Sequence, residues 1–319
     1  MTHSEKIINS YNFARNSNIV FSEIVTVEQF EELNISDYVL IDRTSKYVFY
    51  KLTKFKINEN NIIFSNTDTL INLFKLLKNI KGLSNIKLIT NQTDTMITEY
   101  YYRQKPDCIS EWYSINVDFV SDDLIPIPYG IANNYSPKNL LVNDFNETNV
   151  KKFKENLMYV NFVKNTNFTE REGLYDYFSN KDWALVEEPN LDLSDYKDRL
   201  SKYKFVLCPW GNGVDTHRIW ETLYCGNIPI TKKHHTFSTS LDLPILFVDD
   251  FIFKCSIGEN GKIKNKKEGD KRTPKGLFSL GNLFYRHDRK MKPETKLKCI
   301  KITKKMGWCD DPKSKKNYN

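Results

Sequence analysis

The sequence predicts an α/β protein built on parallel sheets. Short apolar runs alternate with helical stretches along most of the chain, which is typical of parallel strands joined by crossover helices. The run Phe205–Cys208 is continuously apolar, as expected for a strand buried on both faces. The length of 319 residues suggests about two domains, and a hydrophobic content of 40% is enough for packed cores.

The first half of the chain contains apolar runs bounded by polar residues. A helix is predicted over Asp68–Asn79, because its apolar residues recur at helical spacing. A linker is predicted at Asn143–Asn149, which is polar and has no strand pattern, so the first domain spans residues 1–148. The runs that predict strands are Tyr38–Ile41, Val48–Leu52, Ile62–Ser65, Ile86–Thr90 and Ile109–Trp112.

The second predicted domain, residues 149–253, repeats the alternation of strands and helices. Gly226 is predicted to end the helix that precedes its fourth strand. The predicted strands are Met158–Val163, Trp183–Val186, Phe205–Cys208, Ile228–Thr231 and Ile245–Val248.

The last region, residues 254–319, is strongly basic. It holds 17 Lys and 3 Arg against 7 acidic residues, a net charge of +13 in a chain whose total is +7, so the remainder carries −6. A solvated tail explains this composition, and so does a surface that contacts anionic membrane lipids. Nucleic acid is a less favoured partner, because the region has no motif of known nucleic-acid readers.

Several classes of protein are disfavoured by composition. No apolar run is long enough to cross a bilayer, and the first residues lack the apolar core of a signal peptide, so a cytoplasmic location is expected. The six cysteines are not spaced like zinc ligands, either with one another or with histidine, so no metal site is predicted.

The segment from residue 204 to 230, KFVLCPWGNGVDTHRIWETLYCGNIPI, is the most informative about function. It reads as a strand, a glycine-containing loop, a short helix and a second strand, and ligands of open α/β sheets bind at such strand ends. Asn212, Gly213, Asp215 and Thr216 would present backbone N–H groups at the start of the helix, where an anion is favoured. Either Asp215 or Thr216 can cap that helix.

Three residues of the helix extend this predicted anion site. Arg218 can reach a phosphate with a bidentate fork, and Glu221, three residues later, can accept hydrogen bonds from ribose hydroxyls. Alternatively, Arg218 and Glu221 pair with each other on a solvated face. His217 can contact phosphate or be an ordinary polar residue of the first turn.

This segment resembles the donor-binding motif of exostosin-like glycosyltransferases of the bacterial and large-virus type. It departs from their pattern at Trp210, where a basic residue is expected. Two further stretches are similar to the same group: Trp112–Asp118 with Ile125–Asn134, and Tyr159–Phe178.

The resemblance covers residues 85 to 250. It implies two Rossmann-like domains facing a cleft, the GT-B arrangement, with Arg171 as a second contact to the donor diphosphate. Without the resemblance, Arg171 reads as part of an ordinary charged helix start.

The function implied is the transfer of a hexose or pentose from a nucleotide-diphosphate sugar to a hydroxyl of a glycan or another acceptor. No metal or other cofactor is expected, because arginines and a helix end would stabilise the leaving diphosphate. The resemblance points to inversion, which needs a general base, and Asp94 is the candidate, although it also reads as a turn residue. The residues alone also allow retention. Two alternatives are a fucosyltransferase-like enzyme with a guanine nucleotide and a non-catalytic scaffold that uses the basic tail.

Overall fold

The structure is a computed structural model, and it describes residues 7–136, 138–145, 154 and 156–249 together with short stretches between 262 and 303. Residues 1–251 form one compact unit and residues 252–319 form a second. The first unit holds a seven-stranded sheet and a five-stranded sheet. The predicted α/β class is confirmed, with a large sheet rich in parallel strands and several helices, consistent with a Rossmann-like fold.

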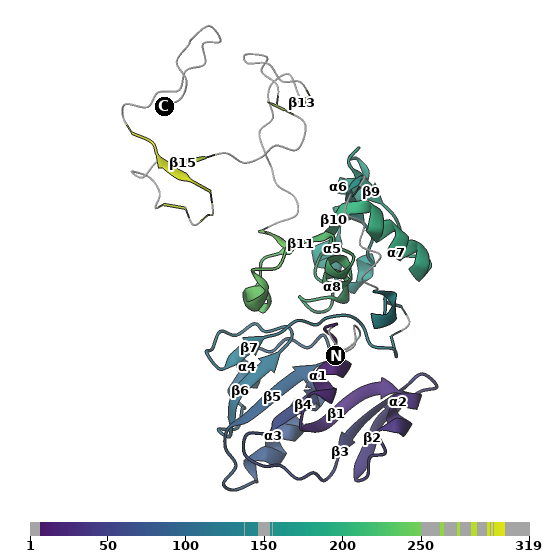
Figure 1. Cartoon of the computed structure of the whole chain (residues 1–319), viewed down its shortest axis with the longest axis vertical. Helices are drawn as coiled ribbons and strands as arrows, with labels where there is room; N and C mark the ends of the chain where they lie inside the picture. Colours follow the sequence, from purple (N-terminus) through teal and green to yellow (C-terminus); the bar gives the residue numbers. More distant parts are fainter. Residues whose placement is uncertain are drawn as a thin grey trace. The chain divides into compact units, whose positions relative to one another are not determined.

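The seven-stranded sheet has the order β2-β3-β1-β4-β5-β6-β7 (Figure 1). β1 and β4 to β7 are parallel neighbours, whereas β3 pairs antiparallel with both β1 and β2. The expectation of parallel strands is therefore wrong at this edge, because the turn Thr44–Tyr47 joins β2 and β3 directly as a hairpin. The strands are β1 (Ile19–Thr26), β2 (Tyr38–Arg43), β3 (Tyr47–Leu52), β4 (Ile62–Asn66), β5 (Ile86–Asn91), β6 (Ile109–Ser114) and β7 (Leu124–Pro126).

Helix α3 (Leu70–Lys78) confirms the predicted helix and follows a short 3-10 turn, η2 (Thr67–Thr69). Its buried face packs in one cluster with β4, β5 and β6, and Phe74 meets Trp112 of β6 edge to face, with ring centroids 5.5 Å apart. The apolar face that predicts this helix is thus the face that packs against the sheet. The other helices of this half are short: α1 (Ser10–Arg15), α2 (Val27–Glu32) and α4 (Glu99–Tyr102).

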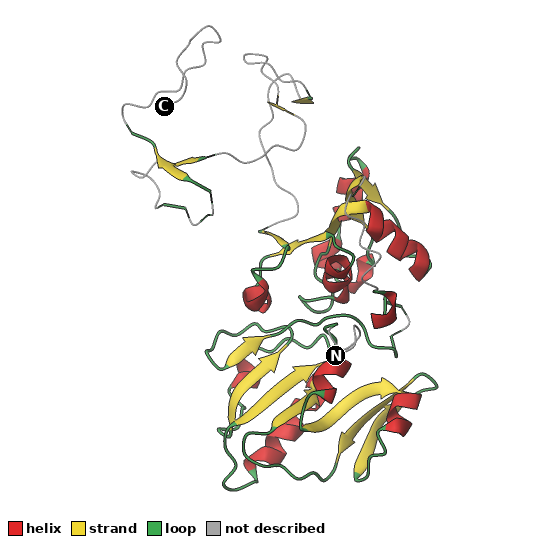
Figure 2. Cartoon of the chain, in the orientation of Figure 1, coloured by secondary structure: helices red, strands yellow, loops and turns green. Residues whose placement is uncertain are grey.

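The five-stranded sheet is parallel throughout, with the order β12-β11-β10-β8-β9. Figure 2 shows the strands in yellow and the helices that connect them in red. β9 lies on one side of β8 and β10 on the other, so the strand order reverses between β8 and β10. In open α/β sheets, ligands bind at the carboxyl ends of the strands on either side of this reversal. The strands are β8 (Asn156–Val160), β9 (Ala184–Val186), β10 (Tyr203–Leu207), β11 (Ile228–Lys232) and β12 (Leu246–Val248).

Helices connect these strands. Helix α8 begins after Thr216, whose side chain makes no capping hydrogen bond, and ends before Gly226, which has a φ of +69°. The prediction that Gly226 ends the helix is confirmed, whereas side-chain capping by Thr216 is not seen. The helices are α5 (Phe168–Arg171), α6 (Leu174–Ser179), α7 (Leu193–Lys202) and α8 (His217–Tyr224), with 3-10 turns η5 (Lys164–Thr166) and η6 (His235–Ser240).

The stretch after β7 packs with the second sheet. Ile131, Leu140 and Phe145 share one buried cluster with Tyr159 of β8 and Trp220 of α8. The 3-10 turn η3 (Val142–Asp144) also lies in this stretch, at the start of the predicted linker, whose later residues are outside the described ones. The boundary at residue 148 remains a prediction.

The second unit is described only in short stretches. These contain two parallel pairs, β13 (Lys262–Ile263) with β14 (Thr273–Pro274), and β15 (Leu283–Tyr285) with β16 (Cys299–Lys301). Most of the basic region, and with it the predicted membrane contact, lies outside the described residues. Within the described part of the chain, no helix has the length and apolar character needed to cross a bilayer.

Candidate functional site

A cavity of about 810 Å³ lies at the point where the strand order of the five-stranded sheet reverses. Asn161 and Val163 reach it from the end of β8, and Gly211 and Asn212 reach it from the loop after β10. Asp94, Tyr129, Ser136, Lys138 and Asn139 line it from the first half of the chain. Its size is that of pockets that enclose small-molecule ligands.

Arg171 fixes the loop after β10. Its Nε donates to the carbonyl of Trp210 at 2.8 Å, and its two terminal nitrogens donate to the carbonyls of Val163 at 2.5 Å and Pro209 at 3.2 Å. Its side chain is 6% exposed, and burial together with the nearby Arg218 charge lowers the Arg171 pKa to about 10. Arg171 lines the cavity as a cation, but its donors already hold main-chain carbonyls.

Arg218 lies beside Arg171 in the cavity wall and has different partners. Its guanidinium donates to the hydroxyl of Tyr196 at 3.0 Å and lies 5.4 Å from the centre of that ring. Within the described parts of the chain, no carboxylate oxygen is within ion-pair distance of Arg218. Burial is the largest single effect and lowers the Arg218 pKa, but Tyr196, Glu221 and other nearby groups together raise it by more, so the guanidinium stays charged. The predicted alternative, an Arg218–Glu221 ion pair on a solvated face, is not formed.

Glu221 is a buried carboxylate of the cavity wall, with 3% exposure. One oxygen accepts from the backbone N–H of Leu140 at 3.1 Å, and the other accepts from Tyr196 at 3.0 Å. Tyr196 thus connects Arg218 to Glu221 through one hydroxyl. Each carboxylate oxygen keeps a second lone pair that can accept from a ligand hydroxyl.

Asp215 does not line the cavity, and its carboxylate instead connects two parts of the fold. Its carboxylate accepts from the backbone N–H of Tyr129 at 2.8 Å and from the indole N–H of Trp220 at 2.9 Å, and it is 1% exposed. Burial raises the Asp215 pKa to about 7, which the two hydrogen bonds oppose. Asp215 therefore joins helix α8 to the stretch after β7.

Gly213 packs against Asn116, which follows β6. A Cβ at Gly213 would lie 2.6 Å from the Asn116 amide nitrogen, so a side chain at this position requires Asn116 to move. The side-chain Oδ1 of Asn116 accepts from the backbone N–H of Asp215 at 2.9 Å. The glycine is needed for close approach between the two halves of the unit, and neither Gly213 nor Asp215 is among the residues that line the cavity.

Asp94 is an exposed residue of the cavity wall, in the loop after β5. One of its carboxylate oxygens accepts from the side-chain amide of Asn212 at 3.2 Å. The predicted base and the predicted phosphate loop therefore meet across the cavity, although they are 118 residues apart in the chain.

His217, the first residue of α8, is held on two sides. Its ring stacks on Tyr129, with centroids 4.1 Å apart, and its Nδ1 lies 2.8 Å from the carbonyl oxygen of Gly130. A carbonyl only accepts hydrogen bonds, so Nδ1 carries the proton and donates. Burial lowers the His217 pKa, while the Gly130 carbonyl, Glu221 and Asp94 oppose that shift.

Most of the predicted site residues are thus brought to one cavity. Sequence reasoning did not select Tyr196 or Tyr129, since a tyrosine in a helix or loop has no signature that separates a ligand contact from packing. The predicted residues that line the cavity are Asp94, Arg171, Asn212, Thr216, His217, Arg218 and Glu221.

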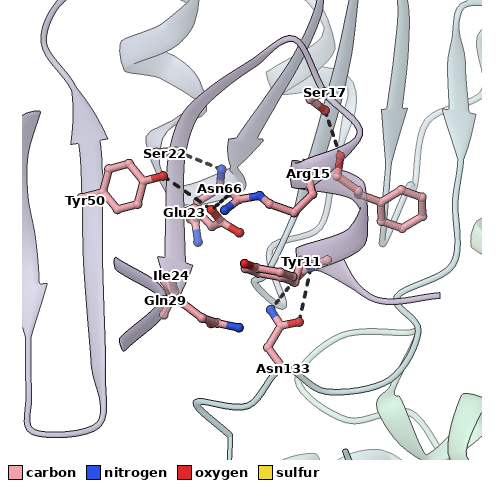
Figure 3. Close-up of polar contacts among 12 residues, drawn as sticks. Tyr11, Arg15, Ser17, Ser22, Glu23, Ile24, Gln29, Tyr50, Asn66 and Asn133 are labelled. Carbon is pink, nitrogen blue, oxygen red and sulfur yellow. Dashed lines mark hydrogen bonds and ion pairs between the residues drawn. The ribbon is translucent and has the colours of Figure 1, made fainter. Parts of the chain in front are cut away.

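A second polar cluster, unforeseen from the sequence, lies on β1 (Figure 3). Glu23 is fully buried and pairs with Arg15 of α1, and the hydroxyl of Tyr50 donates to it at 3.5 Å. Burial raises the Glu23 pKa to about 7, against the opposing effect of Arg15. One oxygen of Glu23 and one nitrogen of Arg15 are buried without a hydrogen-bond partner among the described groups.

Among the described residues, no three His, Cys, Asp or Glu side chains are grouped so that they could hold a metal ion. A comparison with known protein families finds none that matches this chain, and a search of curated proteins finds no significant relative.

Proposed function

We propose that this protein is a glycosyltransferase that moves a sugar from a nucleotide-diphosphate donor to a hydroxyl of a glycan or another acceptor. The observation that carries the proposal is Arg218, a charged guanidinium in the wall of an 810 Å³ cavity with no carboxylate partner among the described residues. A partly buried charge without an ion-pair partner favours an opposite charge nearby, and the cavity is where a ligand can supply one.

The surroundings of Arg218 favour a phosphate group. Arg171 adds a second positive charge in the same wall, and the cavity also receives the start of helix α8. Thr216, at that start, has a buried hydroxyl oxygen without a hydrogen-bond partner among the described groups. Arginines and a helix N-terminus are the donors that typically bind diphosphates.

Most of the predicted residues in the cavity wall have a role in this proposal. The diphosphate lies against Arg218, Asn212 and Thr216, with Arg171 contributing charge, and Glu221 accepts from the ribose hydroxyls. The two sheets correspond to the donor and acceptor domains of a GT-B enzyme, with Asp94 on the acceptor side. The likeness of residues 204–230 to exostosin-like enzymes supports this proposal, and it names neither the sugar nor the base.

The test is a thermal-shift panel of UDP, GDP, dTDP, CMP and their sugars on the full chain. A ligand that binds only the folded protein raises Tm with concentration. One nucleotide family is expected to raise the Tm of the wild type, and Arg218→Met is expected to abolish the shift. Arg199→Met is the matched control, because Arg199 is half-exposed, pairs with Glu187 and is not part of the cavity wall.

Two results would overturn the proposal. One is a panel in which no nucleotide raises the Tm of the wild type. The other is an Arg218→Met protein that folds, as judged by circular dichroism, and shows the same shift as Arg199→Met.

A further inference from the structure

We infer that His217 is the group that protonates when a donor diphosphate binds, and that its imidazolium Nε2–H then donates to the leaving phosphate. The inference rests on the proposed function and adds a catalytic acid to it. Two contacts fix the ring of His217. It stacks on Tyr129 with ring centroids 4.1 Å apart, and its Nδ1 lies 2.8 Å from the carbonyl oxygen of Gly130.

These contacts decide which nitrogen meets the ligand. Nδ1 must keep its proton to donate to Gly130, so in the neutral ring Nε2 is an unprotonated acceptor. His217 lines the cavity, and no group in the described parts of the chain hydrogen-bonds to its Nε2. A neutral His217 therefore presents a lone pair to a phosphate oxygen, which is repulsive, and only the protonated ring can donate a hydrogen bond to it.

Gly130 makes this orientation difficult to change. Its φ is +79°, and a Cβ there would lie 2.1 Å from the backbone oxygen of Ile8. That oxygen also accepts from the N–H of Ile131 at 2.8 Å, so the backbone that carries the carbonyl facing His217 is held against Ile8.

Burial keeps the ring neutral until an anion arrives. It lowers the His217 pKa against the opposing effects of the Gly130 carbonyl, Glu221 and Asp94, and the start of a helix also disfavours the imidazolium. A bound diphosphate brings at least two negative charges to the same wall and reverses this balance. The charged side chains that line the cavity with His217 are Asp94, Lys138, Arg171, Asp192, Arg218 and Glu221, and the stacked Tyr129 is the other titratable group.

The proton has a defined place in the reaction. As the bond between the anomeric carbon and the phosphate oxygen breaks, its electron pair goes to that oxygen. The Nε2–H of His217 donates to the same oxygen and can transfer its proton there, which leaves the imidazole neutral again. The acceptor hydroxyl forms the new bond to the anomeric carbon and loses its own proton to a separate base, for which Asp94 remains the candidate.

The experiment measures protons taken up on binding. The full chain is titrated with UDP and with GDP at pH 7.5 by calorimetry, in two buffers of different ionisation enthalpy. For the nucleotide that binds, the wild type is expected to take up close to one proton, and its Kd is expected to rise as the pH goes from 7 to 8.5, by up to about tenfold per unit. This range lies above the second ionisation of a phosphate, near pH 6.

Matched variants identify the group. His217→Gln is expected to bind more weakly, with no proton uptake and a Kd independent of pH over this range. His234→Gln is the control, since His234 pairs with Asp118 and is not among the cavity residues, and it should behave like the wild type.

The wild type alone provides a further readout if a variant does not fold. Imidazole 15N NMR distinguishes a protonated from a bare nitrogen, and one histidine should carry its proton on Nδ1 alone before UDP or GDP is added and on both nitrogens afterwards. Binding without proton uptake, or uptake that persists in His217→Gln, overturns this inference and leaves the proposed function standing. Absence of any nucleotide binding overturns both.

Discussion

Replacing Arg171 with methionine tests whether this residue holds the loop after β10. Methionine keeps much of the side-chain length and removes the guanidinium, which donates to the carbonyls of Val163, Pro209 and Trp210. Each hydrogen bond from a charged donor contributes about 1.5–3 kcal/mol. Against this stands the cost of holding the charge in a buried position beside Arg218, which lowers the Arg171 pKa to about 10 and is on the order of 3 kcal/mol.

The net effect is a loss of about 3 kcal/mol in the free energy of unfolding, in line with other buried charges that lose their partner groups. For a unit of this size, each kcal/mol corresponds to about 2–4 °C in Tm, so Arg171→Met should lower Tm by roughly 6–12 °C. Differential scanning calorimetry measures this directly. The matched control is Arg199→Met, which removes a half-exposed arginine paired with Glu187, so the change in Tm should be much smaller. Equal Tm values for the two variants would refute the structural role given to Arg171.

Two other predictions concern buried carboxyls and a glycine. Glu23 and Asp215 both have pKa values raised to about 7, so each contributes stability that is complete below the ordinary carboxyl pKa and is lost as the pH rises to about 7. Glu23→Gln with Asp215→Asn should therefore reduce the difference between urea-unfolding free energies at pH 5.5 and pH 8, and an unchanged difference would contradict the burial argument. Gly130→Ala should lower Tm more than Gly173→Ala, because both have φ near +75° but only the first Cβ meets backbone, that of Ile8 at 2.1 Å. Similar Tm values for these two variants would show that the backbone at Gly130 gives way.

The sequence predicts the strand–loop–helix–strand unit well. β10, α8 and β11 lie within two residues of their expected limits, because a continuous apolar run and a glycine after a helix are strong local signals. β1 is absent from the predicted strands for a physical reason: its buried positions include the polar Ser22 and Glu23, so the apolar pattern is interrupted.

The candidate site was predictable in part. The residues of the loop and helix could be proposed from their chemistry, and most of them do line one cavity. The contacts that decide their roles could not be proposed, because they join distant segments: Asn116 with Gly213, Gly130 with His217, and Leu140 with Glu221. Such pairs depend on how the two sheets and their loops pack against each other, and no local sequence pattern predicts that packing.

The central claim is that the cavity beside Arg218 binds a nucleoside diphosphate. The most direct test is calorimetric titration of the full chain with UDP, GDP and dTDP, each compared with the nucleoside that lacks the phosphates. We expect one diphosphate to bind with a stoichiometry of one and its nucleoside to bind at least about 100-fold more weakly, since most of the affinity comes from charge-assisted contacts. Equal binding of nucleoside and diphosphate, or no binding of any diphosphate, would contradict the account.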